Sequence, residues 1–218
     1  MLVLDGLLLH RVGVNGQFGA ELLGAGDLLR PWQGEKLSHT LPTTSGWRVL
    51  EPTRIAVLDK RFARQMVRYP QLAGQLVARA LERSRNLAVN MAIVHHARVD
   101  VRIHILLWHL AGRWGHMRSD GVLLPLQLSH DLLANLTAAD CPAVTSALCD
   151  LAKRNLVHSL YDSWLLIGEP PGELLEFAPL PQSLASIAFS EDPWPKPSVR
   201  RAVRGGWGGA EAQLWPRR

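Results

Sequence analysis

The chain has 218 residues, of which 24 are Lys or Arg, 19 are Asp or Glu and 47% are hydrophobic. That length fits one large or two small domains, and the apolar fraction excludes a fully disordered chain. No run approaches the roughly 20 apolar residues that cross a bilayer, which excludes an integral membrane protein. The start, MLVLDGLLLHRVG, lacks the basic region and cleavage site of a signal peptide, so we expect a cytoplasmic protein.

Short strands are predicted for residues 1–58. Asp5-Gly6 and Asn15-Gly16 are strong turn signals because these residues tolerate positive φ, and Glu51-Pro52 separates the last two runs. Residues 31–46 have the composition of an irregular loop. The predicted strands are Leu2–Leu4, Leu7–Val12, Phe18–Leu23, Trp47–Leu50 and Arg54–Leu58.

A helical pattern replaces the strands in residues 59–98. Asp59–Arg68 is a short amphipathic helix that stops at Tyr69-Pro70, since a residue before proline disfavours the α conformation. A helix of about 28 residues, from Gln71 to about Arg98, would span about 42 Å, longer than its own domain core needs. We interpret it as a dimerisation helix; the alternative is a long helix lying on its own sheet. Its apolar seam alternates spacings of four and three and comprises Ala73, Val77, Ala80, Ser84, Leu87, Met91 and Val94.

Residues 99–178 read as a third unit. A helix at Val101–Trp114 precedes an extended stretch at Val122–Leu128. Ser129 and Asp140 then have the chemistry to cap two helices on either side of a tight turn. Two strands follow, Leu156–Leu160 and Trp164–Ile167. This order is typical of a winged helix-turn-helix.

Several other features predict no further site. The Pro/Gly/Arg-rich tail, residues 179–218, is expected to be disordered. Cys141 and Cys149 would lie roughly 12 Å apart on one helix, too far for a disulfide. His96, Asp100 and His104 would share a face for a metal only on an unbroken helix, and we expect a break near Arg98–Asp100. We therefore predict no metal, no cofactor and no enzymatic activity.

Six blocks together resemble the cyclic-AMP receptor protein/FNR (CRP/FNR) family of bacterial transcription regulators. They are GAGDLL at 24–29, EPTRIAVL at 51–58, RIHILLWHLA at 102–111, LSHDLLA at 128–134, PAVTSAL at 142–148 and LAKRNLV at 151–157. Each motif is loose, but their order and spacing are fairly specific over residues 2–177. The resemblance implies an α+β fold: a partial cyclic-nucleotide-binding-like β-roll (1–58), a linker and long dimerisation helix (59–98) and a C-terminal winged helix-turn-helix (99–178).

Family membership implies a homodimer whose paired recognition helices enter successive major grooves of promoter or operator DNA, with RNA polymerase as a further partner and no membrane contact. On the predicted recognition helix, Thr145, Ser146, Cys149 and Lys153 should point outward, and Ser129 and His130 are donors on the phosphate side. From these faces we select the residues expected at the DNA. They are Ser129, His130, Cys141, Ala143, Thr145, Ser146 and Lys153.

Three departures from the family pattern modify these expectations. Compared with the family pattern the β-roll lacks its first strands, so we expect a chain truncated by about 40 or more residues at its N-terminus. The stretch Leu29–Gly46 carries Gly34-Glu35 but no Arg matching the phosphate-binding one, so we expect no response to cyclic AMP. The recognition helix opens with Asp140-Cys141-Pro142 instead of Arg.

The charge distribution supports a second hypothesis. Residues 99–178 hold 5 basic and 9 acidic side chains, whereas residues 1–98 hold 13 and 7. Negative charge beside a recognition helix opposes phosphate. The alternative is therefore a ligand- or protein-binding dimer whose degenerate winged helix no longer reads DNA.

Overall fold

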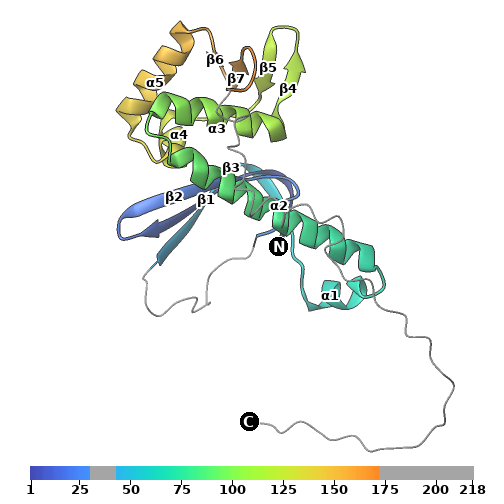
Figure 1. Ribbon diagram of the computed structural model, residues 1–218. Helices are drawn as coiled ribbons and strands as arrows, with labels where there is room; N and C mark the ends of the chain where they lie inside the picture. The colour runs from blue at the N-terminus through green and yellow to red at the C-terminus, as the bar shows by residue number, and fades with distance from the viewer. Residues whose placement is uncertain (30–42, 172–218) are drawn as a thin grey trace, which may run out of the picture. The chain divides into compact units, whose positions relative to one another are not determined.

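The computed structural model describes residues 1–29 and 43–171 (Figure 1). They belong to one compact unit, Met1–Glu176, which mixes helices with antiparallel sheets. The predicted disordered tail at 179–218, most of the predicted loop at 31–46 and the Gly34-Glu35 pair lie outside the described residues. The boundaries expected at residues 58 and 98 stay predictions.

Three antiparallel strands form the first sheet, in the order β2-β1-β3. They are β1 (Leu2–Val14), β2 (Gln17–Leu23) and β3 (Thr43–Ala56). The prediction of five shorter strands was wrong: Asp5-Gly6 lies inside β1 and Glu51-Pro52 inside β3. The pairing of β1 with β3 shifts register between Val3 and Leu8, and Gly6 has φ +92°. A bulge thus absorbs the irregular residues without ending either strand.

The helical segment contains two helices, α1 (Lys60–Met66) and α2 (Pro70–Val94). The Asp59 carboxylate caps α1 by accepting hydrogen bonds from the Arg61 and Phe62 amides, and Pro70 occupies the first turn of α2. α2 ends four residues before the predicted Arg98. The break that follows it separates His96 from the helix carrying Asp100 and His104, and no group of three or more metal-binding side chains occurs among the described residues.

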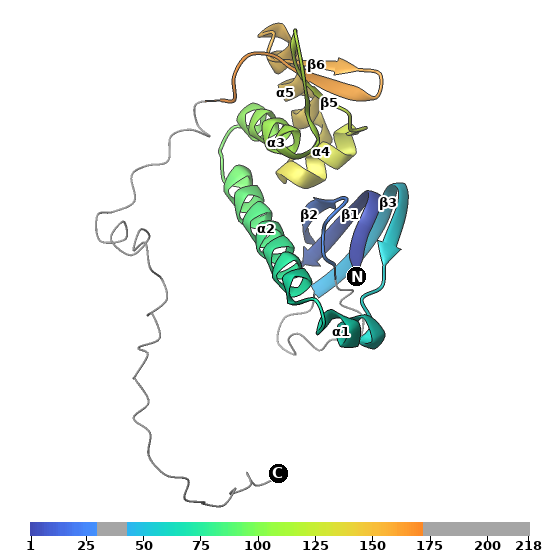
Figure 2. The same cartoon turned by 90° about the vertical axis from the view of Figure 1, so that its right-hand side faces the viewer.

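The main core surrounds α3 (Val99–Trp114), whose Ile103, Leu106 and Leu107 are at most 1% exposed. Each such side chain contributes about 1.5–3 kcal/mol when fully buried. α3 packs against α4 (His130–Thr137) and α5 (Cys141–Lys153), which Figure 2 shows gathered beside the second sheet. Leu7, Leu9 and Leu22 of the first sheet belong to the same apolar cluster.

Four short strands form the second sheet, in the order β4-β5-β7-β6. They are β4 (His116–Arg118), β5 (Gly121–Leu124), β6 (Val157–Leu160) and β7 (Ser163–Leu166). The β6–β7 hairpin was predicted. β4 was missed because its three residues are all exposed and carry no apolar alternation, and the extended stretch predicted at Val122–Leu128 is a strand only as far as Leu124.

A buried polar network joins the first sheet to α2. His10 Nδ1 on β1 lies 2.8 Å from Glu21 Oε1 on β2, and both residues are less than 10% exposed. Arg83 of α2 donates from Nε and Nη2 to the Glu21 carboxylate and from Nη1 to the Leu28 carbonyl. Burial alone raises the pKa of Glu21, but the hydrogen bonds from His10 and Arg83 and the charge of Arg83 outweigh it and hold that pKa below its usual value.

A second ion pair joins the turn after β2 to α3. Arg113 Nη2 lies 2.7 Å from Asp27 Oδ2 and also donates to the Ala25 carbonyl. Asp27 also stabilises its own turn, because the Gly24 amide donates a hydrogen bond to the same carboxylate oxygen. The two networks therefore attach the three-stranded sheet to α2 and to α3.

No single helix in the described part of the chain has the length and apolarity to cross a membrane. The pair α4 and α5, bent by 101° at its break, meets these criteria only jointly.

We expect Glu21→Gln to lower the free energy of unfolding by about 1–3 kcal/mol near neutral pH, because Arg83 and His10 lose a charged acceptor. Folding lowers the pKa of Glu21 below its ordinary value, so the stabilisation is fully present above that ordinary value and is lost as the pH falls through the pKa of the folded state. Urea unfolding from about pH 7 to about pH 3 should show the wild-type advantage shrinking. An advantage that stays constant over this range would contradict the assignment.

Candidate nucleic-acid interface

Helices α4 and α5 meet at 101° across the three residues Ala138–Asp140. This angle and turn length are those of a helix-turn-helix. Ser129 caps α4 by accepting a hydrogen bond from the Leu132 amide at 3.2 Å, and Asp140 caps α5 by accepting one from the Ala143 amide at 2.7 Å. Both caps were predicted from the sequence, and both are confirmed.

The turn is held from α3 by a residue that sequence reasoning missed. Arg102 donates from Nη1 to the carbonyls of Thr137 and Ala138, at 3.1 and 3.2 Å. These carbonyls belong to the C-terminal end of α4, where helices leave acceptors unsatisfied. Thr137, fully buried, donates to the Leu133 carbonyl. Arg102 thus fixes the angle between α4 and α5, and its 35-residue separation from Thr137 leaves no local signal.

α5 has one buried and one exposed face. Its buried residues are Val144, Ala147, Leu148 and Leu151, which pack into the main core. Thr145, Ser146, Cys149 and Lys153 are exposed, as the sequence predicted. The exposed face of α5 is therefore polar, small in side-chain volume and available to a partner.

The residues expected at the DNA are partly brought together. His130 Nδ1 lies 2.9 Å from Thr145 Oγ1, and Thr145 in turn donates to the Cys141 carbonyl at 3.0 Å. Ser129, the cap of α4, and Cys141 and Ser146 of α5 are also exposed, whereas Ala143 of α5 is half-buried. Lys153 lies at the opposite end of α5 from Cys141, so the set forms a strip along the helix, not one compact site.

Cationic side chains near this strip are already engaged. Lys153 Nζ lies 3.3 Å from Asp150 Oδ1, Arg154 Nη1 lies 3.4 Å from Asp100 Oδ2, and Arg118 pairs with Asp120. With Arg102 on carbonyls and Arg113 on Asp27, each of the five Lys and Arg residues of 99–171 has an acceptor. The interface therefore offers phosphate little uncommitted positive charge.

Asp100, at the start of α3, pairs with both Arg98 and Arg154. The hydrogen bond from Arg98 exceeds the opposing effect of burial and lowers the pKa of Asp100, with the charges of Arg98 and Arg154 acting in the same direction. Asp100 therefore stays ionised and draws the end of α5 toward α3. Nearby, burial and then the charge of Arg113 lower the pKa of His109.

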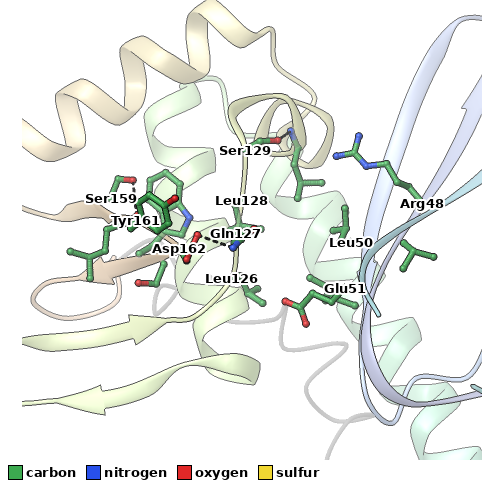
Figure 3. A pocket seen from close by; sticks show the side chains of 16 residues that line it. Arg48, Leu50, Glu51, Leu126, Gln127, Leu128, Ser129, Ser159, Tyr161 and Asp162 are labelled. Carbon is green, nitrogen blue, oxygen red and sulfur yellow. Dashed lines mark hydrogen bonds between the residues drawn. The ribbon is translucent and has the colours of Figure 1, made fainter. Parts of the chain in front are cut away.

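A cavity of about 450 Å³ lies between β3 and the start of α4 (Figure 3). Its walls come from β3, including Arg48 and Glu51, and from the β6–β7 turn, where Gln127 donates to Asp162 at 2.7 Å. In Figure 3 the side chain of Arg48 extends toward Ser129. Arg48 therefore adds a basic group beside the cap of α4, which sequence reasoning did not assign.

Five of the seven predicted seam residues of α2 are exposed. Val77 and Met91 are 58% and 64% exposed, and Ala80, Ser84 and Leu87 are exposed too, while Ala73 and Val94 are half-buried. α2 also lies on its own sheet through Arg83, and Leu87, Met91 and Val94 line a cavity together with residues of β2, so the dimer helix and the helix lying on its own sheet both stay predictions. Whether the seam binds a second copy stays a prediction.

Comparisons with known proteins identify the fold. No family model matches the sequence, and no curated protein matches it. Among solved structures, the chain is similar to a CooA variant from Carboxydothermus hydrogenoformans, with 17% identity and a TM-score of 0.59 over 86% of this chain and 78% of that one.

Two further structures agree. CprK in complex with OCPA has 15% identity and a TM-score of 0.56 over 77% of each chain. CLP, a c-di-GMP responsive global regulator of Xanthomonas campestris, has 16% identity and a TM-score of 0.54 over 77% of this chain and 84% of that one. These proteins are CRP/FNR regulators, so the resemblance seen in the sequence is confirmed for the fold.

Replacing Asp140 separates its capping role from its charge. We expect Asp140→Ala to lower the free energy of unfolding by about 1 kcal/mol, because the Ala143 amide loses its acceptor. Asp140→Asn should leave it unchanged within about 0.5 kcal/mol, since Asn caps helices as well as Asp does. Urea unfolding of the three proteins measures both effects, and equal losses in the two variants would argue against the cap.

Proposed function

We propose that the chain is a CRP/FNR-type transcription regulator that binds double-stranded DNA as a homodimer through a C-terminal winged helix-turn-helix. The observation that carries the proposal is the exposed polar face of α5, held at 101° to α4 in a chain with the fold of such regulators. In this proposal α5 enters the major groove, α4 crosses the phosphate backbone, and the β6–β7 hairpin is the wing. Residues 1–58 form the partial β-roll, and 99–178 the DNA-binding domain.

The exposed strip supplies both kinds of DNA contact. Thr145 and Ser146 carry hydroxyls that reach base edges, with Cys141 and Ala143 beside them at the start of the helix. Ser129, His130 and Lys153 flank them on the phosphate side, where contacts position the protein without reading sequence. Few of these groups are cationic, so the proposed affinity is low for a regulator of this size.

The outer face of α2 supports the homodimer. Its apolar residues are exposed along several turns, and a second copy of α2 would bury them against the same residues about a two-fold axis. Two-fold symmetry places two copies of α5 at half-sites about one helical turn of DNA apart. RNA polymerase is the further partner expected of a protein with this proposed function.

Cyclic AMP is not the effector in this proposal. The described end of the corresponding stretch, Thr43–Gly46, contains no Arg to pair a cyclic phosphate, and Ser45 Oγ instead lies 3.0 Å from His10 Nε2.

The engaged cations favour one alternative, a ligand- or protein-binding dimer that no longer reads DNA. The two functions differ in their response to salt. We expect the chain to bind a promoter fragment. The logarithm of its affinity should fall linearly with the logarithm of the salt concentration, with a slope of about −0.9 for each phosphate contacted. A mobility-shift titration measures the slope, and a flat response or no binding would favour the alternative.

An arginine on the exposed face of α5 should strengthen DNA binding. We expect Ser146→Arg to bind promoter DNA at least about fivefold more tightly, because a guanidinium pairs with guanine in the major groove. Ser119→Arg is the matched control: it adds the same charge on the β4–β5 turn, at the sheet edge opposite β6. Equal gains in a mobility-shift assay would mean that net charge, not the position on α5, determines binding.

Two alanines of α2 test the dimer. Ala80 and Ala78 are both exposed, but Ala80 lies on the seam and Ala78 does not. We expect Ala80→Glu to shift sedimentation to a single subunit, because two carboxylates would face each other across the axis. Ala78→Glu should remain a dimer. A wild-type protein that sediments as one subunit would itself contradict the homodimer.

A further inference from the structure

Three polar side chains, one from each strand of the first sheet, form a continuous chain of hydrogen bonds. Ser45 Oγ of β3 lies 3.0 Å from His10 Nε2 of β1, and His10 Nδ1 lies 2.8 Å from Glu21 Oε1 of β2. The strand pairing explains why these residues meet. His10 is directly opposite both Glu21 and Trp47, and Ser45, two residues before Trp47, projects from the same face of the sheet.

The charge of Glu21 determines which nitrogen of His10 carries a proton. Arg83 pairs with the Glu21 carboxylate, so this group is ionised near neutral pH and acts only as an acceptor. The neutral imidazole of His10 therefore donates its Nδ1 proton to Glu21, and its unprotonated Nε2 accepts from the Ser45 hydroxyl. This is the tautomer in which an imidazole removes the proton of a serine nucleophile.

The burial of these groups is that of a held base beside an accessible nucleophile. His10 is 2% exposed, and the Trp47 ring stacks on it with 4.1 Å between the ring centroids. This contact and the two hydrogen bonds fix the orientation of the imidazole. Ser45 itself is exposed, so a reagent in solution reaches its hydroxyl.

The backbone of β3 offers a second group to a reaction at Ser45. β3 is the outer strand of the described sheet, and every second N–H of an outer strand points away from its neighbour. Such an amide beside Ser45 would stabilise the negative charge that develops on a carbonyl oxygen under attack.

We propose that Ser45 is an activated nucleophile and a site of covalent acylation by small activated esters with an apolar acyl group. Ser45 Oγ attacks the carbonyl carbon, and its proton passes to His10 Nε2. As the bond between that carbon and the leaving oxygen breaks, His10 gives the proton to the leaving alcohol or phenol. The protein is then an ester at Ser45, and His10 is neutral again.

The neighbours of Ser45 determine the class of acyl group. Val12 is directly opposite Ser45 on β1, and Trp47 and Val49 follow it at alternate positions of β3, so the four side chains share one face. Trp47 and Val49 are 37% and 63% exposed. An apolar acyl chain covers these side chains and removes their surface from water, whereas a charged one would have to lose its hydration to do so.

An alkyl fluorophosphonate tests the activation of Ser45 on the full chain. Ser45 Oγ attacks its phosphorus, the P–F bond breaks, and the proton leaves through His10 as fluoride departs. We expect one label per chain by intact-mass measurement, and peptide mapping should place it on Ser45. Because general-base catalysis typically gives about 10²–10⁴-fold, Ser45 should react at least about 100-fold faster than Ser119, an exposed serine on the β4–β5 turn.

Two esters of p-nitrophenol test the acyl class. The butyryl and succinyl esters have acyl chains of the same length, and only the succinyl group carries a charge. We expect peptide mapping to find butyryl on Ser45, formed faster than succinyl. Equal rates would overturn the apolar preference.

Three variants identify the base. His10→Asn keeps an amide donor for Glu21 and removes Nε2, so labelling of Ser45 should slow at least about 100-fold. Ser45→Ala should leave its peptide unlabelled. Thr44→Ala is the matched control, because the Thr44 hydroxyl bonds to the Gly13 carbonyl instead of to His10, and this variant should label like the wild type.

Where His10→Asn does not fold, the comparison of Ser45 with Ser119 in the wild type still decides. The proposal is overturned where wild-type Ser45 stays unlabelled, where it reacts no faster than Ser119, or where folded His10→Asn labels as fast as the wild type. None of these outcomes depends on whether the chain binds DNA.

Discussion

The rotation of α2 about its own axis depends on the buried contact between Arg83 and Glu21. Arg83 bonds to both carboxylate oxygens and to the Leu28 carbonyl, so the side of α2 that carries it must face the sheet. Breaking such a pair inside a protein is expensive, because the remaining charge stays buried. With that side fixed, Val77, Ala80 and Ser84 remain exposed. One ion pair thus determines which side of α2 contacts the sheet and which side stays exposed.

The part of the structure formed by α3, α4, α5 and the second sheet is stabilised mainly by apolar contacts. Its core is almost purely apolar, and α3 supplies side chains to α4, α5 and the second sheet. Polar groups lie at the edges of this core. Arg102 donates hydrogen bonds to the carbonyls at the end of α4, and Asp100 pairs with Arg154 at the end of α5. These contacts consume cations that a DNA-binding surface would otherwise present. The contacts that hold α4 and α5 in place therefore also engage the cations of this part of the chain.

Under the proposed function, this weakness affects regulation. A DNA-binding domain with little free positive charge binds DNA with a modest free energy. A small change in the orientation of this domain therefore strongly alters the fraction of DNA sites that it occupies. A ligand shifts such an equilibrium only by its difference in affinity between the two orientations.

Local signals in the sequence determined the helices of this protein, both caps of the helix-turn-helix and the two faces of α5, because each depends on side chains within about four residues of one another. Tertiary structure alone decided that Asp5-Gly6 and Glu51-Pro52 lie within long strands, since a bulge exists only against a partner strand. It alone brought Arg83 to Glu21, 62 residues apart, and Arg113 to Asp27, 86 apart. Pairings over such distances follow from packing of the whole chain, which no local pattern encodes.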